Sequence, residues 1–95
     1  MSNKQAINAT IDLLQRKWIM RIIWELREEA LTFRQLQVAC GKISPTSLNK
    51  RLNELRQHDL VEHIDMEGYQ LTDNGKSLLM ASKPLIDWAA QWWIR

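Results

Sequence analysis

The sequence predicts a mainly α-helical fold with a small β-hairpin, an α+β architecture. Apolar residues recur at helical spacings of three and four over most of the chain, whereas residues 60–72 contain two short β-forming stretches around a glycine-bearing turn. The single cysteine, Cys40, excludes an internal disulfide framework, and 45% apolar with 25% charged residues is typical of a globular protein. We expect one domain that spans residues 1–95.

The longest apolar runs are only a few residues long, so we expect no segment that crosses a membrane. The N-terminus lacks the apolar stretch of a secretory signal. These two features predict a cytoplasmic protein with no membrane partner.

The N-terminal segment predicts a helix from about Ala6 to Leu14, because apolar residues at positions 7, 11 and 14 fall on one face. A second helix is expected from about Trp18 to Glu28. Nothing between the two looks like a helix breaker, so a break around residues 15–17 and one continuous helix both stay open.

A third helix is predicted to begin at Thr32, because Thr32 to Gln35 has the spacing of a capping box. Ala30 and Leu31 are expected to form a very short strand just before it. The helix should end near Gly41, which leaves a tight connection to the next helix.

The next helix is predicted over residues 44–58, with Ser44 as its N-cap and Pro45 at its first position. Leucines at positions 48, 52 and 55 form one stripe that must be buried. A short helix, a turn of about four residues and a polar-faced helix form the helix-turn-helix arrangement. We expect this motif over about residues 32–58.

The outward face of the helix at residues 44–58 carries short or bifunctional hydrogen-bonding groups, which suit base edges in a major groove. The alternative is an ordinary amphipathic helix with a solvated polar side. Arg51 lies near the leucine stripe, so its alternative role is a structural clamp. We expect base contacts from Thr46, Ser47, Lys50 and Asn53, and phosphate contacts from Arg34, Gln35, Asn49 and Arg51.

Charge divides sharply along the chain. Residues 34–56 hold five basic residues and one acidic residue, whereas residues 59–73 hold five acidic residues and no basic one. The basic block is the expected footprint of phosphate contact, and the acidic block is not. We therefore expect the hairpin not to enter a minor groove, since its carboxylates would repel phosphates.

A last helix is predicted from about residue 73 to residue 95, with Thr72 as its cap and Pro84 inside it. Its apolar surface is wider than one small core needs, which favours a homodimer through the N- and C-terminal helices. The alternative is that the tryptophans close the core of a single chain. The expected interface residues are Ile7, Ile11, Leu14, Leu85, Trp88, Trp92 and Trp93.

The order of elements, from two helices through a helix-turn-helix and a hairpin to a terminal helix, is that of a winged helix-turn-helix domain. Its motifs are Lys17-Trp18, the run from Leu31 to Leu36, Ile43-Ser44-Pro45, Leu48, Arg51-Leu52, Glu54-Leu55, Leu60-Val61-Glu62, the run from Tyr69 to Thr72, and Gly75. On these motifs the chain resembles the HxlR-type bacterial transcriptional regulators, a branch of the MarR-like winged-helix proteins.

The resemblance implies a dimer built from the N- and C-terminal helices, with the helix at residues 44–58 in the major groove and the hairpin as the wing. Family members commonly carry a cysteine ahead of the first helix, which some of them use for redox or electrophile sensing, and the corresponding place falls near Gln5 here. We therefore expect no thiol sensing there. Cys40 matches a family position that is usually apolar, so we expect a buried structural thiol.

The leading hypothesis is a sequence-specific double-stranded DNA-binding regulator, a dimeric repressor that acts by operator occlusion. A second hypothesis is a ligand-sensing or protein-interaction module, with a small aromatic effector stacked on tryptophans such as Trp24, Trp88, Trp92 or Trp93. A third hypothesis keeps the fold without DNA binding, and the acidic hairpin docks on a protein. We expect no enzyme, no cofactor and no metal, since the sequence has no phosphate loop, activated nucleophile or metal-ligand spacing.

Overall fold

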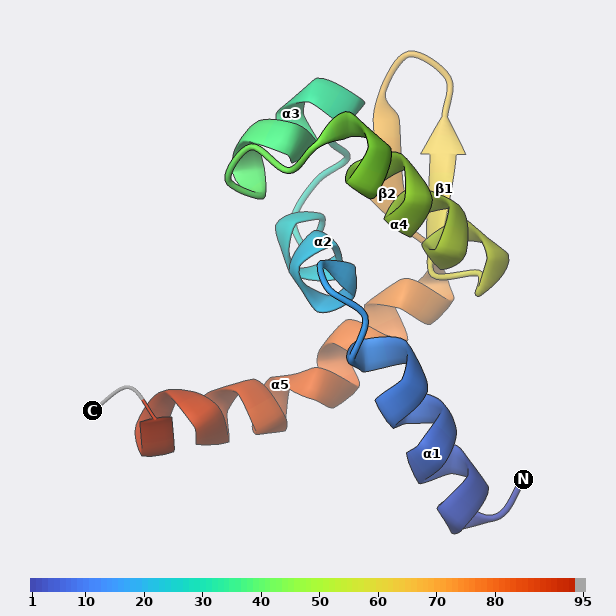
Figure 1. Cartoon of the computed structure of the whole chain (residues 1–95), viewed down its shortest axis with the longest axis vertical. Coiled ribbons are helices and arrows are strands. Elements are labelled where there is room, and N and C mark those ends of the chain that lie inside the picture. The colour runs from blue at the N-terminus through green and yellow to red at the C-terminus, as the bar shows by residue number, and fades with distance from the viewer. Residues whose placement is uncertain (94–95) are drawn as a thin grey trace.

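The computed structural model describes residues 1–93. Figure 1 shows a body of packed helices and a hairpin, from which two helical arms extend in different directions. We use "body" for residues 19–79 and "arms" for helix α1 and residues 80–93. The elements are α1 (Asn3–Leu14), α2 (Ile19–Glu25), α3 (Phe33–Ala39), α4 (Pro45–Gln57), β1 (Val61–Ile64), β2 (Gly68–Leu71) and α5 (Asp73–Trp93). The predicted class, mainly α with a small hairpin, is confirmed.

The core lies inside the body, where apolar side chains from α2, α3, α4 and the hairpin meet. The three leucines of the α4 stripe are at most 1% exposed, as their spacing predicts. Burying each such side chain stabilises the fold by about 1.5–3 kcal/mol. The buried apolar residues are Ile19, Ile22, Ile23, Leu26, Leu36, Cys40, Ile43, Leu48, Leu52, Leu55, Leu60, Val61 and Leu71.

The helix starts at Thr32 and Ser44 are confirmed. The Thr32 hydroxyl accepts a hydrogen bond from the Gln35 backbone N–H at 3.1 Å, and the Gln35 side chain accepts one from the Thr32 N–H at 2.8 Å. Ser44 accepts from the Ser47 N–H at 3.1 Å, with Pro45 at the first position of α4. These caps fix where α3 and α4 begin and hence the turn between them.

The first two helices are separate. Trp18 has a left-handed backbone with φ of 79°, which ends any continuous helix before α2 begins at Ile19. The predicted start of the first helix at Ala6 is wrong, because Ser2 and Gln5 form a capping box that begins α1 at Asn3. The second helix also ends at Glu25, earlier than predicted.

The hairpin is tied to the segment that precedes α3. β1 and β2 pair antiparallel, with Val61 opposite Leu71. The Leu31 and Tyr69 backbones exchange N–H···O hydrogen bonds of 2.9 and 2.8 Å, so the expected strand at residues 30–31 is a single bridge. Gly68 lies beside this bridge with φ of 99°, and a Cβ there would overlap the Leu31 carbonyl oxygen.

Helix α5 begins against the body and ends in an arm. The Thr72 hydroxyl accepts from the Gly75 N–H at 3.0 Å, which confirms the predicted cap. The helix runs through Pro84 to Trp93, and the last two residues of the prediction lie outside the described residues. No helix within residues 1–93 is long and apolar enough to cross a membrane.

Candidate nucleic-acid interface

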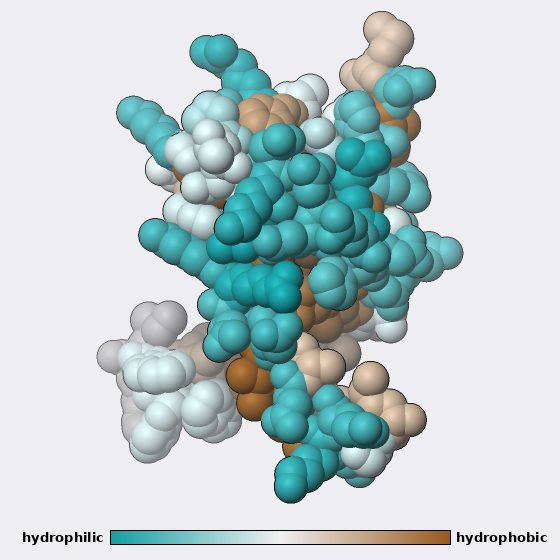
Figure 2. Space-filling model, turned by 45° about the vertical axis from the view of Figure 1, so that its right-hand side comes forward, coloured by the Kyte–Doolittle hydropathy of each residue, from teal (hydrophilic) through white to brown (hydrophobic). Residues whose placement is uncertain are grey.

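The outer face of α4 is the candidate interface, and its orientation follows from the buried stripe. Because the leucines point into the body, the residues on the opposite side of the helix face solvent. Thr46, Asn49, Lys50 and Asn53 are exposed there and share one shallow hollow of about 590 Å³, which Phe33 of α3 borders. Figure 2 shows hydrophilic side chains gathered over the body on this view of the molecule.

The other predicted DNA contacts lie outside the hollow on α4. Arg34 and Gln35 are exposed but border a different hollow on α3, so they lie apart from the α4 group. The Gln35 side-chain oxygen is engaged in the capping box. Ser47 is half-buried, and its backbone N–H is held by the Ser44 cap.

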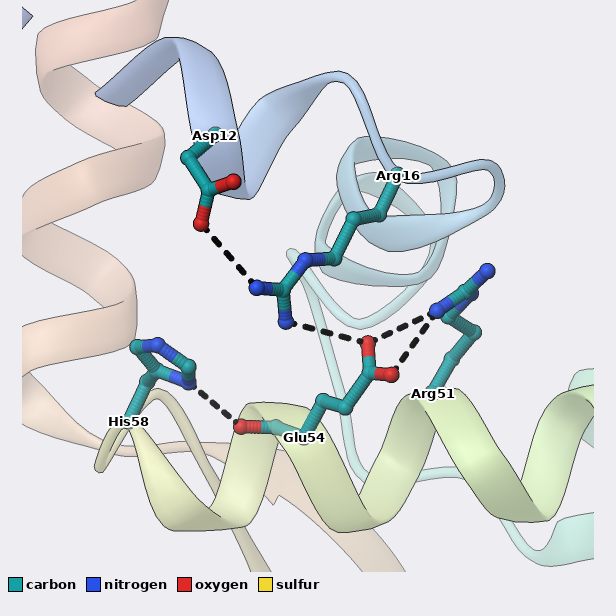
Figure 3. Close-up of polar contacts among 5 residues, drawn as sticks. All are labelled: Asp12, Arg16, Arg51, Glu54 and His58. Atoms are coloured by element: carbon teal, nitrogen blue, oxygen red, sulfur yellow. Dashed lines mark hydrogen bonds and ion pairs between the residues drawn. The ribbon is translucent and has the colours of Figure 1, made fainter. Parts of the chain in front are cut away.

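Arg51 makes the contact that its alternative role as a clamp requires. Its Nη1 donates to both carboxylate oxygens of Glu54 at 2.8 Å, and its side chain is 19% exposed. Arg16, from the link between α1 and α2, places its own Nη1 3.6 Å from Glu54 Oε2. Figure 3 shows the Glu54 carboxylate between the two guanidinium groups.

Electrostatics at Glu54 follow from this arrangement. Burial raises the pKa of the Glu54 carboxyl, but the hydrogen bonds and charge of Arg51, together with the charges of Arg16 and Lys50, lower it by more. The net result is a pKa below the ordinary value of 4.5. The carboxylate is therefore ionised at neutral pH and needs nearby cations to offset its charge.

Two features of this region were not predicted from the sequence. Arg56 is exposed at the end of α4, in a second hollow of about 570 Å³ with Asn53 and the strand residue His63. Its membership of the basic block was the available signal. The ion pair between Arg16 and Glu54 had no such signal, because it joins residues far apart in the sequence.

The wing is short and acidic, as predicted. Residues 65–67 form its tip, and the Met66 side chain there is fully exposed. Glu62 accepts a hydrogen bond from Gln70 Nε2 at 2.6 Å across the hairpin. His63 stacks on Tyr69, with ring centroids 4.6 Å apart, which fixes the imidazole on the strand surface.

The arms expose most of the residues predicted for a dimer interface. Ile7, Ile11, Leu85, Trp88, Trp92 and Trp93 are between 52% and 76% exposed. Trp88 stacks with Trp92, with centroids 6.3 Å apart, and meets Trp93 edge-on at the same distance. The alternative in which these three tryptophans close the core of one chain is wrong. Leu14 differs from the rest because it packs against the core of the body.

Cys40 is buried inside the body at 2% exposure, as expected for a structural thiol. Burial raises the pKa of the Cys40 thiol above its ordinary 9.0, with a lowering contribution from Arg21 and a raising one from Glu25. The thiol is therefore protonated and inert at neutral pH. No group of three or more potential ligands within residues 1–93 is placed to hold a metal ion.

A sequence model described as the HxlR-like helix-turn-helix matches residues 13–95. The chain belongs to the HxlR-like family. Its relatives are transcription regulators, so the chain is a DNA-binding regulator of transcription rather than an enzyme, as predicted. The matched region includes α4, so the exposed polar face of α4 belongs to the helix-turn-helix.

Several regulators resemble this HxlR-like chain over most of its length. The HTH-type transcriptional regulator YdzF of Bacillus subtilis is 33% identical over 98 aligned positions, which cover 95% of this chain and 86% of YdzF. YvaP of the same organism is 28% identical over 89, covering 86% and 82%. The quinone-bound structure of YodB from B. subtilis superposes with a TM-score of 0.83 at 29% identity, covering 97% of this chain and 100% of that one. These similarities confirm the winged helix-turn-helix fold.

Proposed function

We propose that this HxlR-like chain is a dimeric repressor that recognises a specific double-stranded DNA sequence through α4 and acts by occluding an operator. The observation that carries the proposal is the hollow on the outer face of α4 in which Thr46, Asn49, Lys50 and Asn53 lie together. Amide and ammonium groups of this kind make the bidentate and single hydrogen bonds that distinguish base pairs in a major groove.

The size of α4 supports this mode of binding. A helix of 13 residues is about 20 Å long, and an α-helix fits the width of a B-DNA major groove. In the proposed complex Thr46, Ser47, Lys50 and Asn53 face bases. Phosphates are contacted from the flanks by Asn49, Arg34 and Gln35, and Arg56 joins this set. Arg51 stays on Glu54 and supports the helix.

The exposed apolar arms support the dimer. A set of large apolar side chains at half exposure or more is costly in water, and a second copy of the chain offers the same complementary surface. A dimer would present two α4 helices to half-sites about 34 Å apart on one face of the duplex. Repression by occlusion requires only that such a dimer cover the operator. We expect a regulator of this kind to work in the cytoplasm, where its DNA lies.

In this proposal the wing makes no contact with the minor groove. Asp65 and Glu67 at its tip would repel phosphates, so the hairpin stays out of the minor groove. Specificity then rests on α4 and on the spacing of the two half-sites.

A small aromatic effector is a second candidate feature, favoured by one hollow. Trp24 of α2 borders a hollow of about 360 Å³ against α5, and the charged residues that line this hollow are Arg27, Lys83 and Asp87. YodB, which is similar in fold, has been solved with a bound quinone. Titrating planar aromatic compounds against the tryptophan fluorescence of wild-type protein and of Trp24→Phe tests this site. Equal quenching of both proteins would exclude it.

Selection from a random duplex library with purified protein tests the main proposal. We expect enrichment of an inverted repeat with half-sites one helical turn apart, and Lys50→Ala and Asn53→Ala should lose preference within the half-site. Transcription in vitro from a promoter that overlaps the selected site should fall when protein is added. Binding that is sequence-blind and lost with added salt would overturn the proposal.

A further inference from the structure

Arg16 lies where the α1 arm meets the proposed reading helix. It follows the end of α1, and its guanidinium spans two elements with its two terminal nitrogens. Nη2 donates to Asp12 Oδ2 on α1 at 3.0 Å, while Nη1 lies 3.6 Å from Glu54 Oε2 on α4. Figure 3 shows this guanidinium between the two carboxylates. It is the ion-paired link between the α1 arm and α4 within residues 1–93.

Little else fixes the direction of the α1 arm. None of the residues Asn3–Leu14 is buried, and the arm leaves the body through a non-helical link that contains the left-handed Trp18. Leu13 and Leu14 pack against the core at the end of the arm, which anchors its base. Anchoring one end leaves the tilt of the helix free, whereas an ion pair to a second element restricts it.

The ion pair between Arg16 and Glu54 is partly shielded from solvent, so it can hold the two elements together. The side chains of Glu54 and Arg16 are 17% and 32% exposed, so solvent screens their interaction less than that of a fully exposed pair. Glu54 is also held in place by both hydrogen bonds from Arg51 of the same helix. The carboxylate that Arg16 meets is therefore a fixed point on α4 rather than a mobile side chain.

We propose that Arg16 is a positioning residue that sets the tilt of the α1 arm against α4, and thereby the distance between the two reading helices of the dimer. The inference rests on the proposed function, because α1 is taken to lie in the dimer interface and α4 in the groove. A change of tilt between interface and reading helix moves the two α4 helices relative to each other. Half-site spacing thus becomes a property of this ion pair.

The test measures spacing preference rather than affinity alone. Duplexes carry the inverted repeat selected by the wild-type protein, with the centre-to-centre spacing unchanged or altered by one or two base pairs, and a further duplex carries one half-site. We expect Arg16→Gln to bind the unaltered repeat about threefold to tenfold more weakly and to lose preference among the spacings. Affinity for the single half-site should stay the same.

Matched variants separate positioning from charge and from folding. Lys4→Gln removes the same charge from an exposed position on the same arm and should bind all duplexes as the wild type does. Arg16→Lys, which keeps the cation, should restore most of the spacing preference. Glu54→Gln removes the same contact together with the hydrogen bonds from Arg51, so it should also lose the spacing preference, and the double variant should lose no more of it than Glu54→Gln alone.

The outcomes distinguish a failure of this inference from a failure of the proposed function. An unchanged spacing profile for Arg16→Gln overturns the inference while leaving the proposed function intact. An equal loss on the single half-site also overturns it, since Arg16 would then contact DNA itself. If the wild-type protein selects no inverted repeat, the proposed function fails and the inference fails with it.

Discussion

The body and the arms of this molecule differ in how they use their apolar residues. In the body, the leucines of α4 and the isoleucines of α2 are almost wholly buried against one another. In the arms, Ile7, Ile11 and Leu85 are more than half exposed, as are the larger side chains of Trp88, Trp92 and Trp93. The same residue types thus serve one region as a finished core and the other as a surface that remains accessible.

This difference teaches where the stability of the chain resides. The body carries its own core and its own helix caps, so it needs no second chain to define its shape. The arms contribute surface that a second copy of the chain would cover. Mutations in the two regions should therefore affect different measurements, and four predictions test that separation.

The largest effect is expected from a cavity in the body. Leu52 is 1% exposed, so Leu52→Ala should lower the free energy of unfolding by about 2.7–5 kcal/mol. Chemical denaturation measures it. Val38→Ala, at a position 69% exposed on α3, is the control and should change stability by less than about 0.5 kcal/mol. Equal midpoints for the two variants would contradict the assignment of the core.

The next effect concerns the arms. Trp88 is 52% exposed in the single chain and stacks on Trp92, so its truncation should weaken self-association by about 2–4 kcal/mol. Sedimentation over a dilution series measures the change in Trp88→Ala. Met66→Ala, at the exposed tip of the hairpin, should associate as the wild type does. A Trp88→Ala dimer of unchanged affinity would place the interface elsewhere.

A smaller effect is expected on the polar face of the body. Lys50→Ala and Asn53→Ala should each reduce binding of the selected duplex by about 1–3 kcal/mol. Both side chains are exposed, so the melting temperature should stay unchanged. Lys76→Ala, which removes a charge from an exposed position on α5, is the control. Wild-type binding by both α4 variants would mean that another face reads the DNA.

The smallest expected effect is the pH dependence of the stability that the Glu54 carboxylate contributes. Because the folded-state pKa of Glu54 lies below its ordinary 4.5, the carboxylate stabilises the fold above that value. This stabilisation, less than about 1 kcal/mol for a partly exposed pair, is lost as the pH falls through the folded-state pKa. The difference in unfolding free energy between wild type and Glu54→Gln should therefore shrink below pH 4.5. A difference that is constant from pH 7 to pH 3 would contradict the ion pair.

Local signals explain what the sequence predicted correctly. Thr32 and Ser44 are followed at fixed spacing by the groups that they cap, and the leucines of α4 repeat at helical spacing. Each pattern depends on residues within one or two turns of a helix. The starts of α3 and α4, the buried stripe and the hairpin could therefore be predicted without knowledge of the fold.

Other features depend on distance in space and could not be predicted. The contact between Arg16 and Glu54 requires the link after α1 to pass over α4, which no local spacing encodes. The two roles considered for Arg51 were equally compatible with its place on the helical face, and its hydrogen bonds to Glu54 favour the structural clamp. At Ser2 the missed capping box was a local signal that the apolar periodicity from position 7 onward obscured.

The bridge between Leu31 and Tyr69 has a consequence for how the molecule opens. It joins the segment before α3 to β2, which lies between that segment and β1, so the two amide groups are released only when the body itself separates. The backbone at the hairpin tip has no such attachment to α3. Hydrogen exchange should thus proceed at two rates within the same hairpin, fast at residues 65–67 and slow at Tyr69, with the slow amide reporting the global stability of the body.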